Sequence, residues 1–199
     1  MNKIRVKAAP MLYPLPAVMV SLGDEEYSNI ITIAWTGIIN SNPPMTYISV
    51  TKSRHSHDML VKNKEFVINL VNNKLCNAMD YCGVRSGRNE DKFKSLGLTK
   101  IPGDEVKAPL IKEAPINLEC KVFEIKELPS HDMFMAEIVA VHIDEELIDK
   151  NGKYWFEKAG LIAFNHGGYY NTYDRPIGRF GYSIMKNKTK KKLKAKDSR

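Results

Sequence analysis

Residues 26–56 constrain the fold of this 199-residue chain more than any other stretch. They include the β-branched run Ile30-Ile31-Thr32-Ile33, which favours a strand. Further on comes Pro43-Pro44, which forces a turn because neither proline can donate to a sheet ladder. Residues 45–51 then alternate well enough for another strand. The stretch predicts two β-strands joined by a Pro-Pro turn, rich in hydroxyl and amide side chains beside Trp35.

Strand and helix patterns follow at short intervals along the rest of the chain. Strands are expected at 17–22, 27–35, 65–71, 116–127 and 133–148, and short helices at 57–63, 74–82 and 89–96. We interpret Ser56 as the N-cap of the first helix, and Gly83 and Gly97 as the ends of the other two. Residues 102–115 are expected to form a surface connection, and residues 129–132 a hairpin turn. The pattern indicates a mainly β fold, a closed or nearly closed antiparallel barrel with short helical insertions.

Composition favours one domain over residues 1–187, followed by a basic tail over residues 188–199. The apolar fraction of 43% and the charged fraction of 27% are those of an ordinary globular protein. The tail carries seven cations and one aspartate, so it accounts for +6 of the net charge of +7. Because the remaining body is nearly neutral, we interpret the tail as a solvated end, and nucleic acid is disfavoured as a partner.

Several features predict a cytoplasmic protein. No apolar run approaches the roughly 20 residues that span a bilayer, and Pro10, Pro14 and Pro16 interrupt the place where a signal peptide needs its apolar segment. The chain has three cysteines, an odd number without paired spacing, which disfavours a disulfide framework and a metal site. They are Cys76, Cys82 and Cys120.

The cluster Lys52-Ser53-Arg54-His55-Ser56 offers cations, hydroxyls and backbone N–H groups where a strand ends and a helix begins. These are the donors that a phosphate group needs, and the start of a helix adds to the attraction of an anion. An ordinary helix cap with solvated basic residues explains the same five residues. The cluster alone leaves both interpretations open.

The strand that precedes this cluster adds a second indication. Asn29 and Thr32 interrupt a strand that packing alone would fill with Val and Ile. The small side chain of Ala34 permits a ligand to approach closely, and Trp35 offers an aromatic surface beside it. Amides, hydroxyls and backbone N–H groups are suited to the polar edge of a flat ring such as an isoalloxazine. A half-exposed structural strand remains the alternative for each residue taken alone.

Nothing in the sequence resembles a nucleophile elbow, a zinc-protease motif or a phosphate-binding Walker loop. His55 and His57 are two apart, a spacing that directs them to different faces of a helix and disfavours a shared metal. His131 lies in the expected hairpin turn, where it fits either an active-site residue or a turn residue.

Taken in order, these fragments resemble the flavin reductase-like family of FMN-binding split-barrel proteins, and in particular its flavoredoxin branch. The resemblance covers roughly Pro14 to Ile148, and each fragment alone is unspecific. The matching fragments are Asn29 to Gly37, Ser41-Asn42-Pro43-Pro44, Ser49-Val50, Arg54-His55-Ser56, Phe66-Val67-Ile68-Asn69, Ser86-Gly87-Arg88 and Asp91-Lys92-Phe93.

The resemblance implies a six-stranded Greek-key barrel, a homodimer, and one FMN per subunit held without a covalent bond. It implies that one group of residues lines the flavin ring, namely Asn29, Thr32, Ile33, Ala34 and Trp35. It implies that a second group surrounds the phosphate or closes over the cofactor, namely Ser49, Lys52, Arg54, Ser56, Asn69, Ser86, Gly87, Arg88 and Lys92. His131 corresponds to a histidine near the redox face, and we take it as the catalytic candidate.

We therefore expect flavin-mediated electron or hydride transfer, with a ferredoxin-like protein or NAD(P)H as the electron donor. A glycine that many nicotinamide-using relatives carry is replaced by Met135-Ala136-Glu137, which places the nicotinamide site in question. Three alternatives stay open: an NAD(P)H:flavin oxidoreductase, a barrel that binds FMN without enzymatic activity, and a barrel that binds single-stranded nucleic acid.

Overall fold

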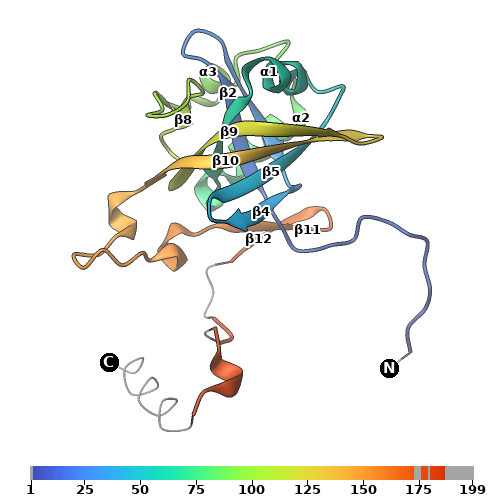
Figure 1. Cartoon of the computed structure of the whole chain (residues 1–199), viewed down its shortest axis with the longest axis vertical. Helices are drawn as coiled ribbons and strands as arrows, with labels where there is room; N and C mark the ends of the chain where they lie inside the picture. The colour runs from blue at the N-terminus through green and yellow to red at the C-terminus, as the bar shows by residue number, and fades with distance from the viewer. Residues whose placement is uncertain (1, 173–175, 179, 187–199) are drawn as a thin grey trace.

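The computed structural model describes residues 2–172, 176–178 and 180–186, and an antiparallel sheet of seven strands dominates it (Figure 1). Neighbours in the sheet follow the order β3-β2-β6-β9-β10-β5-β4. The mainly β, barrel-like fold with short helical insertions is thereby confirmed. The strands are β2 (Val18–Gly23), β3 (Ser28–Ile33), β4 (Thr36–Ser41), β5 (Pro44–Thr51), β6 (Glu65–Leu70), β9 (Ile116–Glu127) and β10 (His131–Ile143).

The sheet curls around an apolar core that includes Phe66 and Phe134, both fully buried. Alternate residues of each strand supply this core because successive side chains point to opposite faces of a strand. The long β9–β10 hairpin crosses the molecule, as Figure 1 shows in yellow. At the open side of the barrel, β3 and β5 approach each other without pairing as a ladder. A hydrogen bond just beyond β3 links the two sides, where the N–H of Ser49 donates to the carbonyl oxygen of Trp35 at 3.0 Å.

Three α-helices cover one end of the barrel and the outer side of β3 (Figure 1). α1 (His55–Asn63) buries Met59 and Leu60 in the barrel core. α2 (Cys76–Val84) and α3 (Lys92–Leu96) pack with Ile30 of β3 through a second apolar cluster. Short 3₁₀ turns occupy Asn73–Leu75, Glu145–Leu147, Phe156–Ala159 and Tyr182–Ile184. No helix in this described part of the chain is long and apolar enough to cross a membrane.

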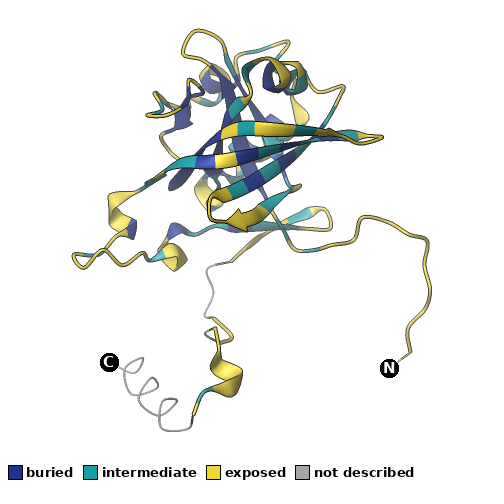
Figure 2. Ribbon diagram, viewed as in Figure 1, coloured by how far each residue is buried: buried dark blue, intermediate teal, exposed yellow. Residues whose placement is uncertain are grey.

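Two small sheets complete the described structure. β1 (Leu15–Pro16), β11 (Ile162–Asn165) and β12 (Gly168–Asn171) form one of them, and β7 (Lys100–Ile101) with β8 (Leu110–Ile111) forms the other. The N-terminal segment extends away from the barrel and is exposed along nearly its whole length, as Figure 2 shows in yellow. The basic tail expected at residues 188–199 lies outside the described residues.

Strand β4 was not expected, and it raises the main sheet from the six strands implied by the resemblance to seven. Its segment contains Gly37, Asn40 and Ser41, which weaken a strand pattern. Pairing with β5 nevertheless makes it the last strand of the sheet. The expected surface connection at 102–115 is also partly wrong, because Val106, Ala108 and Leu110 are buried together.

The ends of the helices and of one hairpin differ from the prediction. α1 begins at His55, two residues earlier than expected, so Ser56 lies inside the helix and Arg54 is the N-cap, without a side-chain hydrogen bond. α2 continues through Gly83 to Val84, and α3 begins only at Lys92, although Gly97 does end it with a φ of 64°. His131 is not a turn residue: it opens β10 and pairs with Thr51. That strand ends at Ile143, five residues before the expected end.

Candidate functional site

Two adjoining cavities lie at the open side of the barrel, where β3 faces β5 and the start of α1. The larger one, of about 350 Å³, is polar, and the smaller one, of about 180 Å³, lies beside Trp35. They share Ile31, Thr51 and Arg54, so Arg54 stands at the boundary between them. Together they fall in the range of roughly 300–1,000 Å³ that is typical of small-molecule sites.

The lining of the larger cavity is suited to an anion. Three cationic side chains line it, and no acidic side chain does among the residues that the structure describes. The first turn of α1 forms one wall, and its N–H groups have no capping side chain to accept from them. The lining residues are Asn29, Ile31, Thr51, Ser53, Arg54, His55, Ser56, Cys82, Arg85, Ser86, Gly87 and Lys92.

Lys92 is the most unusual member of this wall, because its side chain is almost completely buried. Its ammonium group donates to the carbonyl oxygens of Ile30 at 2.7 Å and Cys82 at 2.8 Å, and a lysine has a third donor to offer. Burial lowers the pKa of Lys92. Burial also raises the pKa of the Cys82 thiol to about 11, so this neighbour is uncharged at neutral pH. An anion in the cavity would compensate the buried cation.

Asn29 joins β3 to the helix that carries the basic residues. Its Nδ2 atom donates to Oγ of Ser56 at 2.9 Å, while its buried Oδ1 atom has no partner among the described residues. A buried acceptor without a partner is costly, and a ligand hydroxyl or N–H group would satisfy it. Gly87 closes over this amide so tightly that an added Cβ atom would overlap it. The cavity therefore needs a residue without a side chain at position 87.

The smaller cavity has an aromatic wall. The indole ring of Trp35 and the imidazole ring of His131 lie against each other, with centroids 4.6 Å apart and planes inclined by 36°. Both ring nitrogens of His131 have partners, Oγ1 of Thr51 at 3.0 Å and Oγ of Ser130 at 2.9 Å. The other residues around this cavity are Ile31, Thr32, Ile33, Ala34, Ser49, Val50, Thr51 and Arg54.

The structure brings most of the predicted site residues to these two cavities. Asn29, Arg54, Ser56, Ser86, Gly87 and Lys92 line the larger one, and Thr32, Ile33, Ala34, Trp35, Ser49, Arg54 and His131 line the smaller one. The hydroxyl group of Thr32 does not point freely into the cavity, because it donates to the carbonyl oxygen of Met79.

Three predicted residues do not line either cavity. Asn69 is fully buried, and its amide already has hydrogen-bond partners in the protein. Its Nδ2 atom donates to the Ser21 hydroxyl, and its Oδ1 atom accepts from Nδ2 of Asn117. Lys52 pairs with Glu127 and Asp132 instead of facing the cavities. Arg88 is exposed to solvent.

Conversely, the sequence-based choice of site residues missed Thr51, Ser53, His55 and Arg85. Ser53 and His55 belong to the basic cluster that pointed to a phosphate, so that signal was present. Arg85 was missed because the helix was expected to end at Gly83, which placed residue 85 in an unassigned loop.

Comparison with known proteins agrees with this geometry. The sequence pattern of the flavin reductase like domain matches residues 11–170. The chain belongs to the flavin reductase-like family. The matched region contains every strand of the main sheet and all the residues that line the two cavities.

Solved structures and sequence relatives of this family are close to the chain over most of its length. The flavoredoxin of Desulfovibrio vulgaris (Miyazaki F) is 31% identical with a TM-score of 0.84, and the match covers 92% of this chain and 100% of that one. The flavoredoxin from Methanosarcina acetivorans is 28% identical with a TM-score of 0.82, covering 93% and 100%. An uncharacterised protein of Archaeoglobus fulgidus is 32% identical over 142 residues, or 71% of this chain and 78% of its own length. The split-barrel fold is thereby confirmed.

Proposed function

We propose that this protein is a flavoprotein that binds FMN and transfers electrons or hydride through it. The observation that carries the proposal is the junction of an anion cavity, built on the buried cation of Lys92, with an aromatic-walled cavity beside Trp35. A phosphorylated flat ligand needs both environments, one at each end. Membership of the flavin reductase-like family and similarity to two flavoredoxins support a flavin-related redox function.

In this proposal the larger cavity holds the phosphate end of the cofactor. Arg54, Arg85 and Lys92 supply positive charge, and Ser56 and Ser86 supply hydroxyl donors. Such charge-assisted hydrogen bonds are about twice as strong as neutral ones. The unpartnered Oδ1 atom of Asn29 is suited to accept from a hydroxyl of the ribityl chain. The donor set therefore fits FMN at this end.

The smaller cavity is proposed to hold the ring. A bound flavin ring supplies the redox chemistry, because it accepts a hydride or single electrons and passes them on. The chain contributes binding and orientation: Ala34 leaves room, and Trp35 offers an aromatic face. We propose His131 as the catalytic residue that gives or takes a proton beside the ring, since Thr51 and Ser130 fix its imidazole.

We propose that the working unit is a homodimer whose partner subunit covers the smaller cavity. Trp35 is 40% exposed, and Ile38 and Ile39 on the neighbouring edge strand β4 are 69% and 46% exposed. Apolar side chains that gather at a sheet edge favour contact with another protein surface. A second copy seated on β4 would cover them and shield the ring from water. A cytoplasmic location, which rests on the sequence alone, remains a prediction.

The electron donor separates two versions of the function. In the electron-carrier version a ferredoxin-like protein reduces the bound cofactor, and in the oxidoreductase version NADH or NADPH does so. We favour the carrier because Met135, Ala136 and Glu137 occupy the place where the family resemblance implies a glycine in many nicotinamide-using relatives. These residues lie within β10 and pair with β5.

Spectroscopy tests both statements. The purified protein, recorded before and after addition of FMN, should show a flavin absorbance spectrum that is perturbed relative to free FMN. Stopped-flow reduction of the loaded protein should then be fast with a reduced ferredoxin and slow with NADH or NADPH. An unperturbed spectrum would remove the flavoprotein proposal, and fast reduction by a nicotinamide would remove only the carrier version.

A further inference from the structure

A hydrogen-bonded pair, the half-buried His57 and the buried Asp132, lies just behind the candidate site and lines neither cavity. Asp132 is 4% exposed, and its Oδ2 atom accepts from Nε2 of His57 at 2.7 Å. Its Oδ1 atom lies 3.3 Å from Nζ of Lys52. The imidazole ring of His57 also packs edge-on against Phe134, with centroids 5.5 Å apart. A buried carboxylate is costly, so core packing alone does not explain the position of Asp132.

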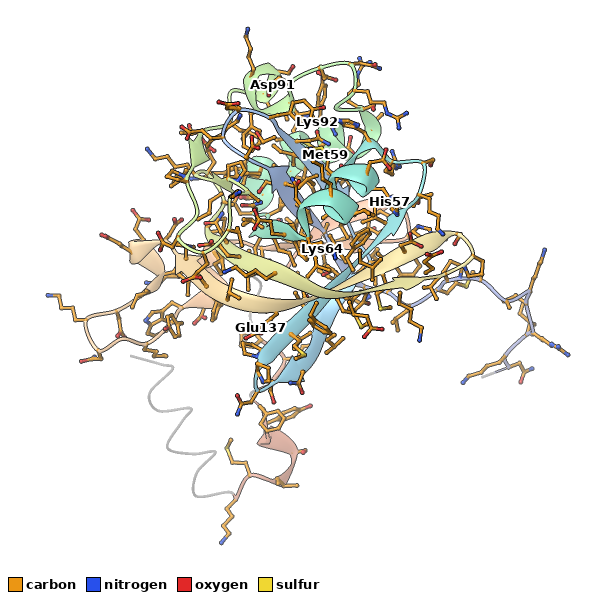
Figure 3. The ribbon with its side chains drawn as sticks, turned by 45° about the horizontal axis from the view of Figure 1, so that its top comes forward. His57, Met59, Lys64, Asp91, Lys92 and Glu137 are labelled. Atoms are coloured by element: carbon orange, nitrogen blue, oxygen red, sulfur yellow. The ribbon has the colours of Figure 1, made fainter. Side chains whose placement is uncertain are left out.

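The two partners come from the two elements that build opposite ends of the site. His57 lies in the first turn of α1, directly after Ser56, and Figure 3 shows it on the side of α1 toward the β9–β10 hairpin. Asp132 follows His131 on β10. Because successive side chains of a strand point to opposite faces, His131 faces the smaller cavity while Asp132 faces α1. The pair thus connects the phosphate-side helix to the ring-side strand.

Further contacts hold the same helical turn from the direction of β3. The hydroxyl group of Tyr27 lies 2.8 Å from Nε2 of His55, and Asn29 donates to Ser56. Of these four residues, His55, Asn29 and Ser56 line the larger cavity. The contact between His57 and Asp132 is the one among them that reaches β10, and it includes a buried carboxylate. The start of α1 is therefore fixed between β3 and β10.

We propose that His57 and Asp132 are positioning residues. They hold the phosphate-binding turn of α1 at a fixed distance from His131, so that the phosphate and the ring of FMN are bound at the same time. This inference rests on the proposed function. A binding site depends on geometry held to within about 0.5 Å by residues behind it. A shift of α1 would move Arg54 and Ser56 away from the phosphate while leaving the ring cavity largely unchanged.

The charge state of Asp132 agrees with this role. Burial by itself raises the pKa of Asp132, but the hydrogen bond from His57 and the nearby cation of Lys52 outweigh it and hold that pKa below its ordinary range. The group is therefore a carboxylate at neutral pH, and it accepts the hydrogen bond that fixes the helix. Asparagine at position 132 has nearly the same shape but a weaker acceptor, so Asp132→Asn tests the contact without creating a cavity.

The experiment compares FMN with riboflavin, which has the same ring and ribityl chain but no phosphate. Asp132→Asn and His57→Ala are each expected to weaken FMN binding about tenfold and to change riboflavin binding less than about twofold. His57→Gln should restore most of the FMN affinity because its amide can donate from about the position of Nε2. The double variant should be little worse than either single one, since both remove the same contact.

Asp58→Asn is the matched control, because it removes an exposed carboxylate that lies 3.7 Å from Nδ1 of the same His57. It should leave both affinities unchanged. Equal losses for FMN and riboflavin, or losses without rescue by His57→Gln, would overturn the positioning role. If Asp132→Asn is too unstable to purify, Lys52→Met should give a smaller loss that is again selective for FMN, and a non-selective loss there overturns the proposal too. Failure of the wild-type protein to bind either flavin would instead overturn the proposed function itself.

Discussion

The ammonium group of Lys92 donates to the carbonyl oxygen of Ile30 across 2.7 Å, although the two residues are 62 positions apart in the chain. This contact places a buried cation of α3 against the strand that forms the wall of both cavities. α3 follows the loop that contributes Ser86 and Gly87 to the larger cavity. The packing of α3 on β3 thus adds a buried cation to the exposed cations Arg54 and Arg85 of the larger cavity.

Replacing Lys92 should distinguish the contribution of the phosphate to FMN binding from that of the ring. Lys92→Met is expected to weaken FMN binding about ten- to hundredfold, the loss typical of a hydrogen bond to a charged group, while riboflavin binding changes little. Lys94→Met is the matched control because Lys94 is exposed on the same helix. Fluorescence quenching titrations with both flavins measure the effect. Equal weakening of both flavins by Lys92→Met would show that Lys92 does not contact the phosphate.

A methyl group at position 87 should disturb the larger cavity. Gly87→Ala would place a Cβ atom onto the amide of Asn29, which must then move away from Ser56. We expect about a tenfold loss of FMN affinity, because a misplaced amide leaves buried polar atoms without partners. Gly37→Ala is the control, since its Cβ atom would meet Tyr47 at an ordinary 3.5 Å. Unchanged FMN affinity in Gly87→Ala would show that this loop does not close over the cofactor.

A charge on the edge strand should test the proposed dimer. Ile38→Glu places a carboxylate at the most exposed apolar position of β4, and burying it against a partner subunit would be costly. We expect a monomer by light scattering, together with weaker FMN binding, because the ring cavity would lose its cover. Val61→Glu, at an exposed position on α1, is the control. A variant that stays dimeric would place the subunit interface elsewhere.

Glu119 predicts how stability depends on pH. This buried carboxylate accepts from the backbone N–H groups of residues 104–106 and contacts His142. Burial raises its pKa, but these hydrogen bonds outweigh burial and hold the pKa below the ordinary value of 4.5. Because the pKa of Glu119 is lower in the folded than in the unfolded state, its contribution to stability is fully present above the unfolded pKa. It is lost as the pH falls through the folded pKa.

The matching variant is Glu119→Gln, which should lower the free energy of unfolding by about 1–3 kcal/mol at pH 7. The difference from the wild-type protein should shrink below about pH 4. Urea unfolding at a series of pH values measures both quantities, with Glu124→Gln, exposed on the same strand, as the control. A difference that stays constant from pH 7 to pH 3 would mean that the ionised carboxylate contributes nothing.

The sequence predicted the barrel because its strands alternate clearly or carry β-branched runs, as Ile30 to Ile33 do. It could not predict β4, whose Gly37 and Asn40 weaken the pattern and whose pairing with β5 is tertiary. The prediction of the helix ends was wrong for a related reason. Ser56 is a good capping residue in isolation, but in the structure its hydroxyl accepts from Asn29.

The candidate site was predictable where residue type and ligand chemistry agree, as at Arg54, Gly87 and Lys92. The prediction was wrong where a polar residue has a long-range partner in the protein. Asn69 satisfies its amide with Asn117, which lies opposite it on β9. Lys52 finds carboxylates at the end of the β9–β10 hairpin. Neither partner can be identified before the strand register is known, because a shift of one residue moves every side chain to the opposite face of the sheet.

The central claim is that one site grips both a phosphate and a flavin ring, and paired titrations with FMN and riboflavin test it most directly. The account predicts that the wild-type protein binds one FMN per chain and binds riboflavin at least about tenfold more weakly, because riboflavin makes no contact with the cations of the larger cavity. Equal affinities for the two flavins, or no binding of either, would contradict it.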